Sequence, residues 1–289
     1  MSALDGESAL VTRFIRKLRG GSQPIMVEAS DGFTYVLKFS NNPQGRSVSF
    51  NEAMGTELYR VVGLPVPKWK PLNVTGEFLC QNPQCWLETP AGPLMPDAEI
   101  CFGSRYLGGR DVRIWEIMPH SSFSRIVNIS DFYLAWLLDI CASHTDNRQA
   151  IFEDHLDGIR AVFVDHDHMF SGPDGRSGQP EYRASAYADV RIYERGSRDC
   201  LVSNSKTVLN ISVDKLWRKS QQLPIEWLTD AALRNFRECL NMLADAKAVQ
   251  SIVELIAGFP EKKGQREFLT EQRTGVDPDW LLRAGIPGA

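Results

Sequence analysis

The sequence lacks the features that direct a chain into or across a membrane. Its first residues, M-S-A-L-D-G-E-S, contain neither a basic segment nor an apolar core, so no secretory signal peptide is expected there. No apolar run approaches the length that spans a bilayer. We therefore expect a cytoplasmic protein without a membrane span.

The sequence also lacks an excess of positive charge and a paired cysteine motif. Its formal net charge of -4 argues against a surface built mainly for nucleic acid. Cys80 and Cys85 are too far apart for a C-x-x-C zinc knuckle, and no second pair accompanies them. We expect all six cysteines to be reduced thiols, several of them within buried apolar runs.

The chain contains enough apolar material for one large two-lobed domain or two modest ones. It has 289 residues, of which 43% are hydrophobic and 24% charged. Residues 10–18 fit a strand or a short helix, and residues 64–99, rich in proline, asparagine and glycine, indicate strands and loops. Later residues show mostly helical spacing, so the pattern favours an α+β protein.

A glycine turn and a lysine-bearing hairpin stand near the start of the chain. The segment R-G-G-S-Q at 19–23 precedes two β-type runs, 25–29 and 33–39, joined at Ser30-Asp31-Gly32. A glycine turn lets backbone N–H groups approach a phosphate, and Lys38 on the second run could reach the same phosphate. A plain flexible turn and an edge-strand lysine are the structural alternatives.

A helix is expected next, beginning near Ser49 or Asn51 and ending at Gly63, with prolines beyond. It places Glu52 in the first turn. A helix-borne glutamate that follows a strand-borne lysine can form the ion pair that holds the lysine on phosphates. The alternative is a glutamate favoured there by the helix dipole.

The stretch 144–170 carries the strongest chemical signal. Two short apolar runs flank Asp157-Gly158, the usual dipeptide of a tight hairpin. Such a hairpin brings Asp146, Gln149 and Asp165 to its open end, where oxygen ligands suit a hard cation such as Mg²⁺. A catalytic aspartate before a hairpin and a metal-binding aspartate after it is also the arrangement of kinase-type phosphoryl transfer.

Two other interpretations of this stretch stay open. A hairpin with polar ends is ordinary surface architecture. The same residues could also ligate a transition metal in a phosphohydrolase. The candidate ligands are His144, Asp146, Asp165, His166, Asp167 and His168. On a strand, Asp165 and Asp167 would share one side while the two histidines share the other, which disfavours one ion bound by the whole run.

Taken in order, these segments resemble the HipA-like kinases, a bacterial branch of the protein-kinase-like superfamily related to type II phosphatidylinositol kinases. The matching segments are R-G-G-S-Q (19–23), Y-V-L-K-F (35–39), N-N-P-Q-G (41–45), N-E (51–52), G-L-P-V-P (63–67), F-G-S-R (102–105), D-N-R-Q-A-I-F (146–152) and V-D-H-D-H-M-F (164–170). The resemblance implies a two-lobed kinase fold, with a β-rich N-lobe at 1–103 and a mainly α-helical C-lobe at 104–289.

The resemblance also implies roles for individual residues in binding ATP. A phosphate-cradling loop would comprise Gly20, Gly21, Ser22 and Gln23. Lys38 would contact the α- or β-phosphate, with Glu52 as its partner. Residues 101–104 would form the hinge to adenine, through Phe102 and Gly103.

For the chemistry, the resemblance implies that Asp146 orients or deprotonates an acceptor hydroxyl, and that Gln149 and Asp165 hold Mg²⁺. The acceptor implied is a protein serine or threonine, although a small molecule or lipid head group would also fit, and a further protein partner is compatible with the sequence. Related kinases carry an asparagine about five residues after the catalytic aspartate, whereas Gln149 follows Asp146 by three and Asn147 could replace it. H-R-D and D-F-G triplets are absent. A nucleotide-binding pseudokinase is therefore the alternative.

Overall fold

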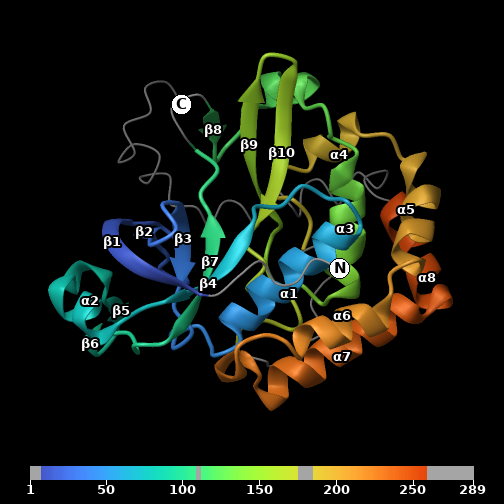
Figure 1. Cartoon of the computed structure of the whole chain (residues 1–289). Helices are drawn as coiled ribbons and strands as arrows, with labels where there is room; N and C mark the ends of the chain where they lie inside the picture. Colours follow the sequence, from blue (N-terminus) through green and yellow to red (C-terminus); the bar gives the residue numbers. More distant parts are fainter. Residues whose placement is uncertain (1–7, 109–111, 175–184, 259–289) are drawn as a thin grey trace.

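Five strands from the first 105 residues close into a barrel in the order β1-β2-β3-β7-β4. The computed structural model describes residues 8–108, 112–174 and 185–258. The barrel strands are β1 (Ala9–Lys17), β2 (Ile25–Ala29), β3 (Thr34–Lys38), β4 (Trp69–Asn73) and β7 (Ile100–Arg105). Figure 1 shows them on one side of the molecule, with the long helices on the other. The predicted hairpin of β2 and β3 is confirmed, and residues 10–18 resolve as a strand.

Between β4 and β7 the chain forms a small appendage to the barrel. It contains α2 (Gly76–Gln81), a 3-10 turn (Pro83–Cys85) and a two-stranded sheet of β5 (Leu87–Thr89) and β6 (Gly92–Leu94). The expectation of strands and loops alone was wrong for α2. Thr75 caps this helix by accepting a hydrogen bond from the Phe78 N–H, at 3.2 Å.

Helix α1 (Val48–Val61) links the barrel to the rest of the molecule. It ends as expected at Gly63, whose φ of +84° is a conformation that glycine adopts without steric cost. The helix starts earlier than the sequence indicated, so its first turn carries no acidic residue. Glu52 therefore lies in the second turn, and attraction to the helix N-terminus does not account for it.

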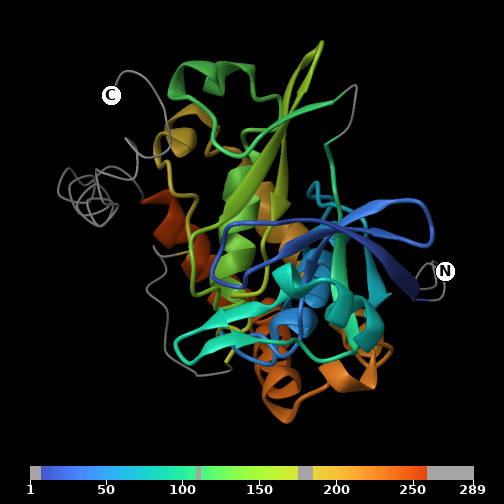
Figure 2. The same ribbon diagram turned by 90° about the vertical axis from the view of Figure 1, so that its left-hand side faces the viewer.

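The second part of the chain combines a three-stranded sheet with helices. The sheet has the order β10-β9-β8, with β8 (Arg113–Trp115), β9 (Gln149–His155) and β10 (Gly158–Val164). The helices are α3 (Asp131–Cys141), α4 (Arg191–Arg195), α5 (Cys200–Leu209), α6 (Val213–Ser220), α7 (Asp230–Ala244) and α8 (Ala246–Ala257), with 3-10 turns at His120–Arg125 and Ile225–Trp227. The β9–β10 hairpin projects from this part (Figure 2). The predicted hairpin around Asp157-Gly158 is confirmed.

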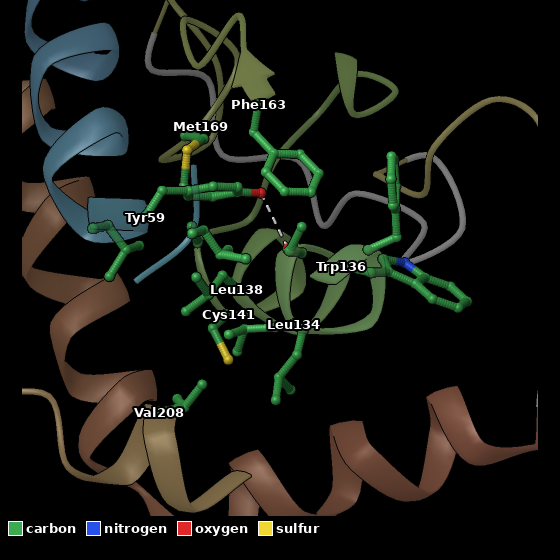
Figure 3. Packing of buried hydrophobic residues seen from close by; sticks show 14 of the residues in the cluster. Tyr59, Leu134, Trp136, Leu138, Cys141, Phe163, Met169 and Val208 are labelled. Atoms are coloured by element: carbon green, nitrogen blue, oxygen red, sulfur yellow. Dashed lines mark hydrogen bonds between the residues drawn. The ribbon is translucent and has the colours of Figure 1, made fainter. Parts of the chain in front are cut away.

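Two hydrophobic cores hold the structure together. One fills the barrel, and the other joins α1 to the sheet and the helices of the second part. Helix α3 lies almost wholly inside the second core, where the Tyr59 hydroxyl of α1 donates to the Ala135 carbonyl at 3.1 Å (Figure 3). All six cysteines are unpaired. Within the described residues, no helix has the length and apolar character needed to cross a membrane.

Candidate active site

Lys38 stands at the end of β3 and is 7% exposed. Its ammonium donates to three carboxylates at once. The Nζ lies 2.5 Å from Glu52 Oε1, 2.6 Å from Asp165 Oδ1 and 2.7 Å from Asp167 Oδ2. The pairing of Lys38 with Glu52 that the sequence suggested is therefore present. The structure also brings Asp165 to the same lysine from 127 residues further along the chain.

The two aspartates belong to a turn that follows β10 at Val164. Asp165 has a φ of +65°, the left-handed region that non-glycine residues seldom adopt. The residues after Val164 therefore do not continue as the strand that served to compare the faces of the two aspartates and the two histidines. Asp165 and Asp167 still share a side, because both contact Lys38. Residues held in this region often mark functional sites, because the surrounding structure has to enforce them.

Helix α1 also contacts this turn, through hydrogen bonds from Asn51 to its backbone. The buried Asn51 amide nitrogen lies 2.8 Å from the carbonyl oxygens of Asp167 and Met169 and 3.2 Å from that of Gly172. One helical turn later, Gly55 allows the helix to approach the turn closely. A Cβ at Gly55 would lie 2.5 Å from the Cβ of His166. The position of Glu52 relative to the aspartates thus depends on close contact between α1 and this turn.

We predict that Gly55→Ala destabilises the protein by about 1–3 kcal/mol, because the added methyl group overpacks the contact with His166. Glycine to alanine inside a helix normally stabilises by about 0.5–1 kcal/mol, so the expected sign is reversed. Urea denaturation measures the difference. Gly76→Ala at the start of α2 is the matched control, since its Cβ would meet nothing closer than 3.9 Å. Equal stability of Gly55→Ala and wild type would contradict the close approach.

Burial and charge act in opposite directions on the groups around Lys38. Burial alone would lower the pKa of Lys38, but the carboxylates of Asp165, Asp167 and Glu52 outweigh it and raise that pKa well above its usual value. Burial raises the pKa of Glu52 to about 7, against the effect of Lys38. Burial also raises the pKa of Asp165, whereas at Asp167 the Lys38 ammonium outweighs burial and lowers the pKa. The lysine is therefore firmly charged.

The same carboxylates can hold a metal ion. One oxygen each from Glu52, Asp165 and Asp167 lies within 4.8 Å of the others. Three carboxylates with a single lysine carry surplus negative charge, and oxygen ligands suit Mg²⁺ or Mn²⁺. The donor set therefore fits a hard divalent cation, with Asp165 as the ligand that the sequence predicted.

The histidines of the hydrolase alternative lie elsewhere. His144 and His166 are buried beside Arg148, with ring nitrogens 3.5 Å and 3.3 Å from its guanidinium. Burial, followed by the Arg148 charge, lowers the pKa of both histidines well below its usual value, so both are neutral. His168 meets the Thr145 hydroxyl at 3.0 Å. In the described part of the chain, the residues grouped closely enough to bind one ion include no histidine. The structure does not assemble a mixed histidine–aspartate metal site.

The glycine loop at 20–23 lies over the loop that follows β3. Gln23 N–H donates to the Gly20 carbonyl at 3.1 Å, which closes the turn. The Ser22 carbonyl accepts from the Asn42 amide at 2.6 Å. The Gln23 side chain points toward β5, where its amide exchanges two hydrogen bonds with the Glu88 backbone. Gln23 thereby ties the loop to β5. Phosphate binding by Gly20, Gly21, Ser22 and Gln23 stays a prediction.

The predicted hinge residues lie on strand β7 of the barrel. Phe102 is paired with Lys38 on one side and Pro71 on the other, and Gly103 likewise lies between β3 and β4. Strand β7 runs from Ile100 to Arg105, and the lobe boundary after residue 103 stays a prediction. The contact of Phe102 and Gly103 with adenine stays a prediction. Their position next to Lys38 in the sheet places them close to the same site.

The segment before β9 carries the predicted catalytic aspartate. Asp146 is exposed, and its Oδ1 accepts from the Asn147 N–H at 2.7 Å. Gln149 is also exposed and opens β9 directly opposite Val164, the residue before Asp165. The hairpin thus brings the start of β9 to the turn that holds Asp165, as expected. Base catalysis by Asp146 and metal binding by Gln149 stay predictions.

Sequence reasoning missed several residues that build this site. The sequence names Asp167 as a candidate ligand only for the hydrolase alternative, and it gives Asn51 and Arg148 no role beyond the segments that contain them. It gives Asp139, the partner of Arg148, no role at all. A signal did exist, since Asp139 is a lone charge inside the apolar run F-Y-L-A-W-L-L-D-I-C, and a buried acid requires a partner.

Comparisons with known proteins identify the fold. A scan against models of protein families finds no match, and a search of curated proteins finds none. The kinase CtkA of Helicobacter pylori, described as proinflammatory, has a similar structure, with a TM-score of 0.55 and 9% identity over 86% of this chain and 99% of that one. A hydra Fam20 solved with sugar gives a TM-score of 0.52 and 12% identity over 84% and 87%. A Golgi casein kinase gives 0.50 and 14% over 84% and 73%.

The chain has a protein-kinase-like fold. The β-rich first part and the helical second part expected from the sequence are confirmed. Identities this low show the fold alone, and the resemblance to HipA-like kinases stays an expectation from the sequence segments.

Proposed function

We propose that this chain is an ATP-dependent phosphotransferase of the HipA-like kinase type, acting on a hydroxyl acceptor. The observation that carries the proposal is the meeting of Lys38, Glu52 and Asp165 between the barrel and the helical part. A strand lysine, a helix glutamate and an aspartate after a hairpin are the parts that kinase-type phosphoryl transfer requires. A protein serine or threonine is the first acceptor to test, and the cytoplasm, where thiols stay reduced, is the proposed location.

Each group has a defined task in this proposal. Lys38 binds the α- or β-phosphate of ATP, and Glu52 keeps the ammonium pointed at it. Asp165, with Asp167, would hold Mg²⁺, which neutralises charge on the transferred phosphoryl group when bound. Asp146 accepts the proton of the acceptor hydroxyl and aligns its oxygen. The protein contributes mainly position and charge, since phosphoryl transfer needs little covalent work from side chains.

The first test is thermal unfolding with and without ATP and Mg²⁺. At a ligand concentration about 100-fold above the dissociation constant, binding should stabilise the wild type by about 2.7 kcal/mol. The shift should shrink strongly in Lys38→Met and Asp165→Asn, each compared with its own ligand-free melting temperature. Lys70→Met, which removes a half-buried lysine paired with Asp31, is the matched control and should keep the full shift.

The alternatives give different results. A shift produced by a transition metal without ATP would favour the phosphohydrolase. If millimolar ATP with Mg²⁺ does not raise the melting temperature of the wild type, the kinase proposal is refuted.

A further inference from the structure

Arg148 is a fully buried cation that contacts three other parts of the structure. Its Nε and Nη2 donate to the two carboxylate oxygens of Asp139 in α3, at 2.9 and 2.7 Å. Its Nη1 donates to the carbonyls of Val164 and Asp165, at 2.8 and 3.1 Å. The guanidinium also lies over the Tyr59 ring of α1, 4.9 Å from the centroid. One side chain thus ties α3 and α1 to the turn that carries Asp165.

The geometry at Asp165 explains why an arginine is useful there. Asp165 has the left-handed backbone conformation, which costs free energy and has to be enforced by its surroundings. Arg148 holds the carbonyl of this same residue and that of the residue before it. Only a guanidinium presents enough donors in a fixed fork to satisfy a carboxylate and two carbonyls together.

The surroundings of Arg148 keep those donors directed at the turn. Asp139 forms an ion pair with Arg148 at 2.7 Å, and the Tyr59 hydroxyl donates to Asp139 Oδ1 at 2.8 Å. Stability by itself does not require this pair, because well-packed apolar residues often replace a buried ion pair without loss.

We propose that Arg148 is a positioning residue that fixes the backbone of Asp165 and thereby aims its carboxylate at Lys38 and the cation. This inference rests on the proposed function, since it assumes that Asp165 binds the metal. Arg148 would act through the Asp165 backbone, and not by binding the cation or the nucleotide itself. Its effect should appear as weakened metal binding with little change in ATP binding, because residues that orient a metal ligand typically contribute 10–100-fold to metal affinity.

The decisive variant is Arg148→Met/Asp139→Leu, which removes both charges together and leaves no unpaired ion in the core. The Tyr59 hydroxyl retains the Ala135 carbonyl as a partner. Mn²⁺ affinity is measured by electron paramagnetic resonance with a non-hydrolysable ATP analogue present, and nucleotide affinity is measured separately. We expect Mn²⁺ affinity to fall about 10–100-fold with nucleotide affinity within about twofold. Arg148→Lys, which keeps the charge with fewer directed donors, should lie between this variant and wild type.

The outcomes separate the two proposals. Wild-type Mn²⁺ affinity in the folded double variant, or in Arg148→Lys if the double variant does not fold, would overturn the role of Arg148 alone. Wild type that binds no Mn²⁺ with nucleotide would overturn the proposed function together with this inference. Asp165→Asn, which removes the carboxylate itself, sets the lower limit of affinity in the same assay.

Discussion

Lys38→Met should lower the free energy of unfolding by about 3–5 kcal/mol, because removing one partner of a buried ion pair leaves its charges uncompensated. Glu52 and Asp167 have side chains only 4% and 3% exposed, so water cannot replace the lysine. Denaturant titrations near neutral pH measure the loss. Millimolar Mg²⁺ or Mn²⁺ should return part of it, since a divalent cation can take the place of the ammonium.

Two controls test whether charge causes this loss. Lys70→Met removes a lysine whose partner, Asp31, is partly exposed, and should cost about 0–1 kcal/mol. Adding Glu52→Gln to Lys38→Met should recover stability, because it removes one of the repelling carboxylates. If Lys38→Met were as stable as Lys70→Met, the three carboxylates would not depend on Lys38.

The free energy of unfolding should depend on pH through the Glu52 carboxyl. Burial raises the pKa of Glu52 to about 7 in the folded protein, so the folded state binds a proton that the unfolded state releases at lower pH. The stability from this proton is fully present below the unfolded pKa and is lost as pH rises through about 7. Without Lys38 the pKa of Glu52 should rise further, because the lysine charge lowers it. The difference in free energy of unfolding between wild type and Lys38→Met should therefore become smaller as pH falls.

Asp146→Asn should reduce phosphate transfer by about 10²–10⁴-fold, the usual contribution of a positioned acid or base. Because Asp146 is exposed, the free energy of unfolding should stay within about 0.5 kcal/mol of wild type. The affinity for ATP with Mg²⁺ should also remain. Quench-flow or steady-state transfer to an acceptor peptide measures the rate, and the thermal shift checks binding.

This variant also separates the kinase from the pseudokinase. If wild type binds ATP with Mg²⁺ but transfers no phosphate to peptide, lipid or water, it acts as a nucleotide-binding module. If Asp146→Asn keeps the wild-type rate, another group positions the acceptor. Asp157→Asn in the β9–β10 turn removes an exposed carboxylate away from the open end of the hairpin and is the matched control.

Local signals made much of this site predictable. Turn chemistry located both hairpins, and chain order linked Lys38, Glu52 and Asp165 to a kinase pattern. Helix α2 was missed because its six residues lie in a segment rich in turn formers, where a short helix leaves little periodicity.

Long-range contacts explain the rest. Asn51 acts through carbonyls more than 110 residues away, and a sequence pattern contains no record of those partners. The burial of Arg148 depends on contacts with α1 and α3, which the sequence around it does not reveal. The sequence places Asp165 after the hairpin but does not predict its left-handed backbone, because that conformation at an aspartate has no distinct sequence signature.

The division of the interior into two cores has a consequence for cooperativity. Phe39, next to Lys38, packs in the barrel core, whereas helix α1 and the segment after β10 pack in the other. The lysine therefore lies on a barrel strand, next to a residue of the barrel core, whereas all three acids lie on segments that pack in the other core. A local opening of the barrel would move the Lys38 ammonium away from the three carboxylates, while these carboxylates stay close to one another. Nucleotide with its cation, bound to both units, would couple their unfolding into a single transition.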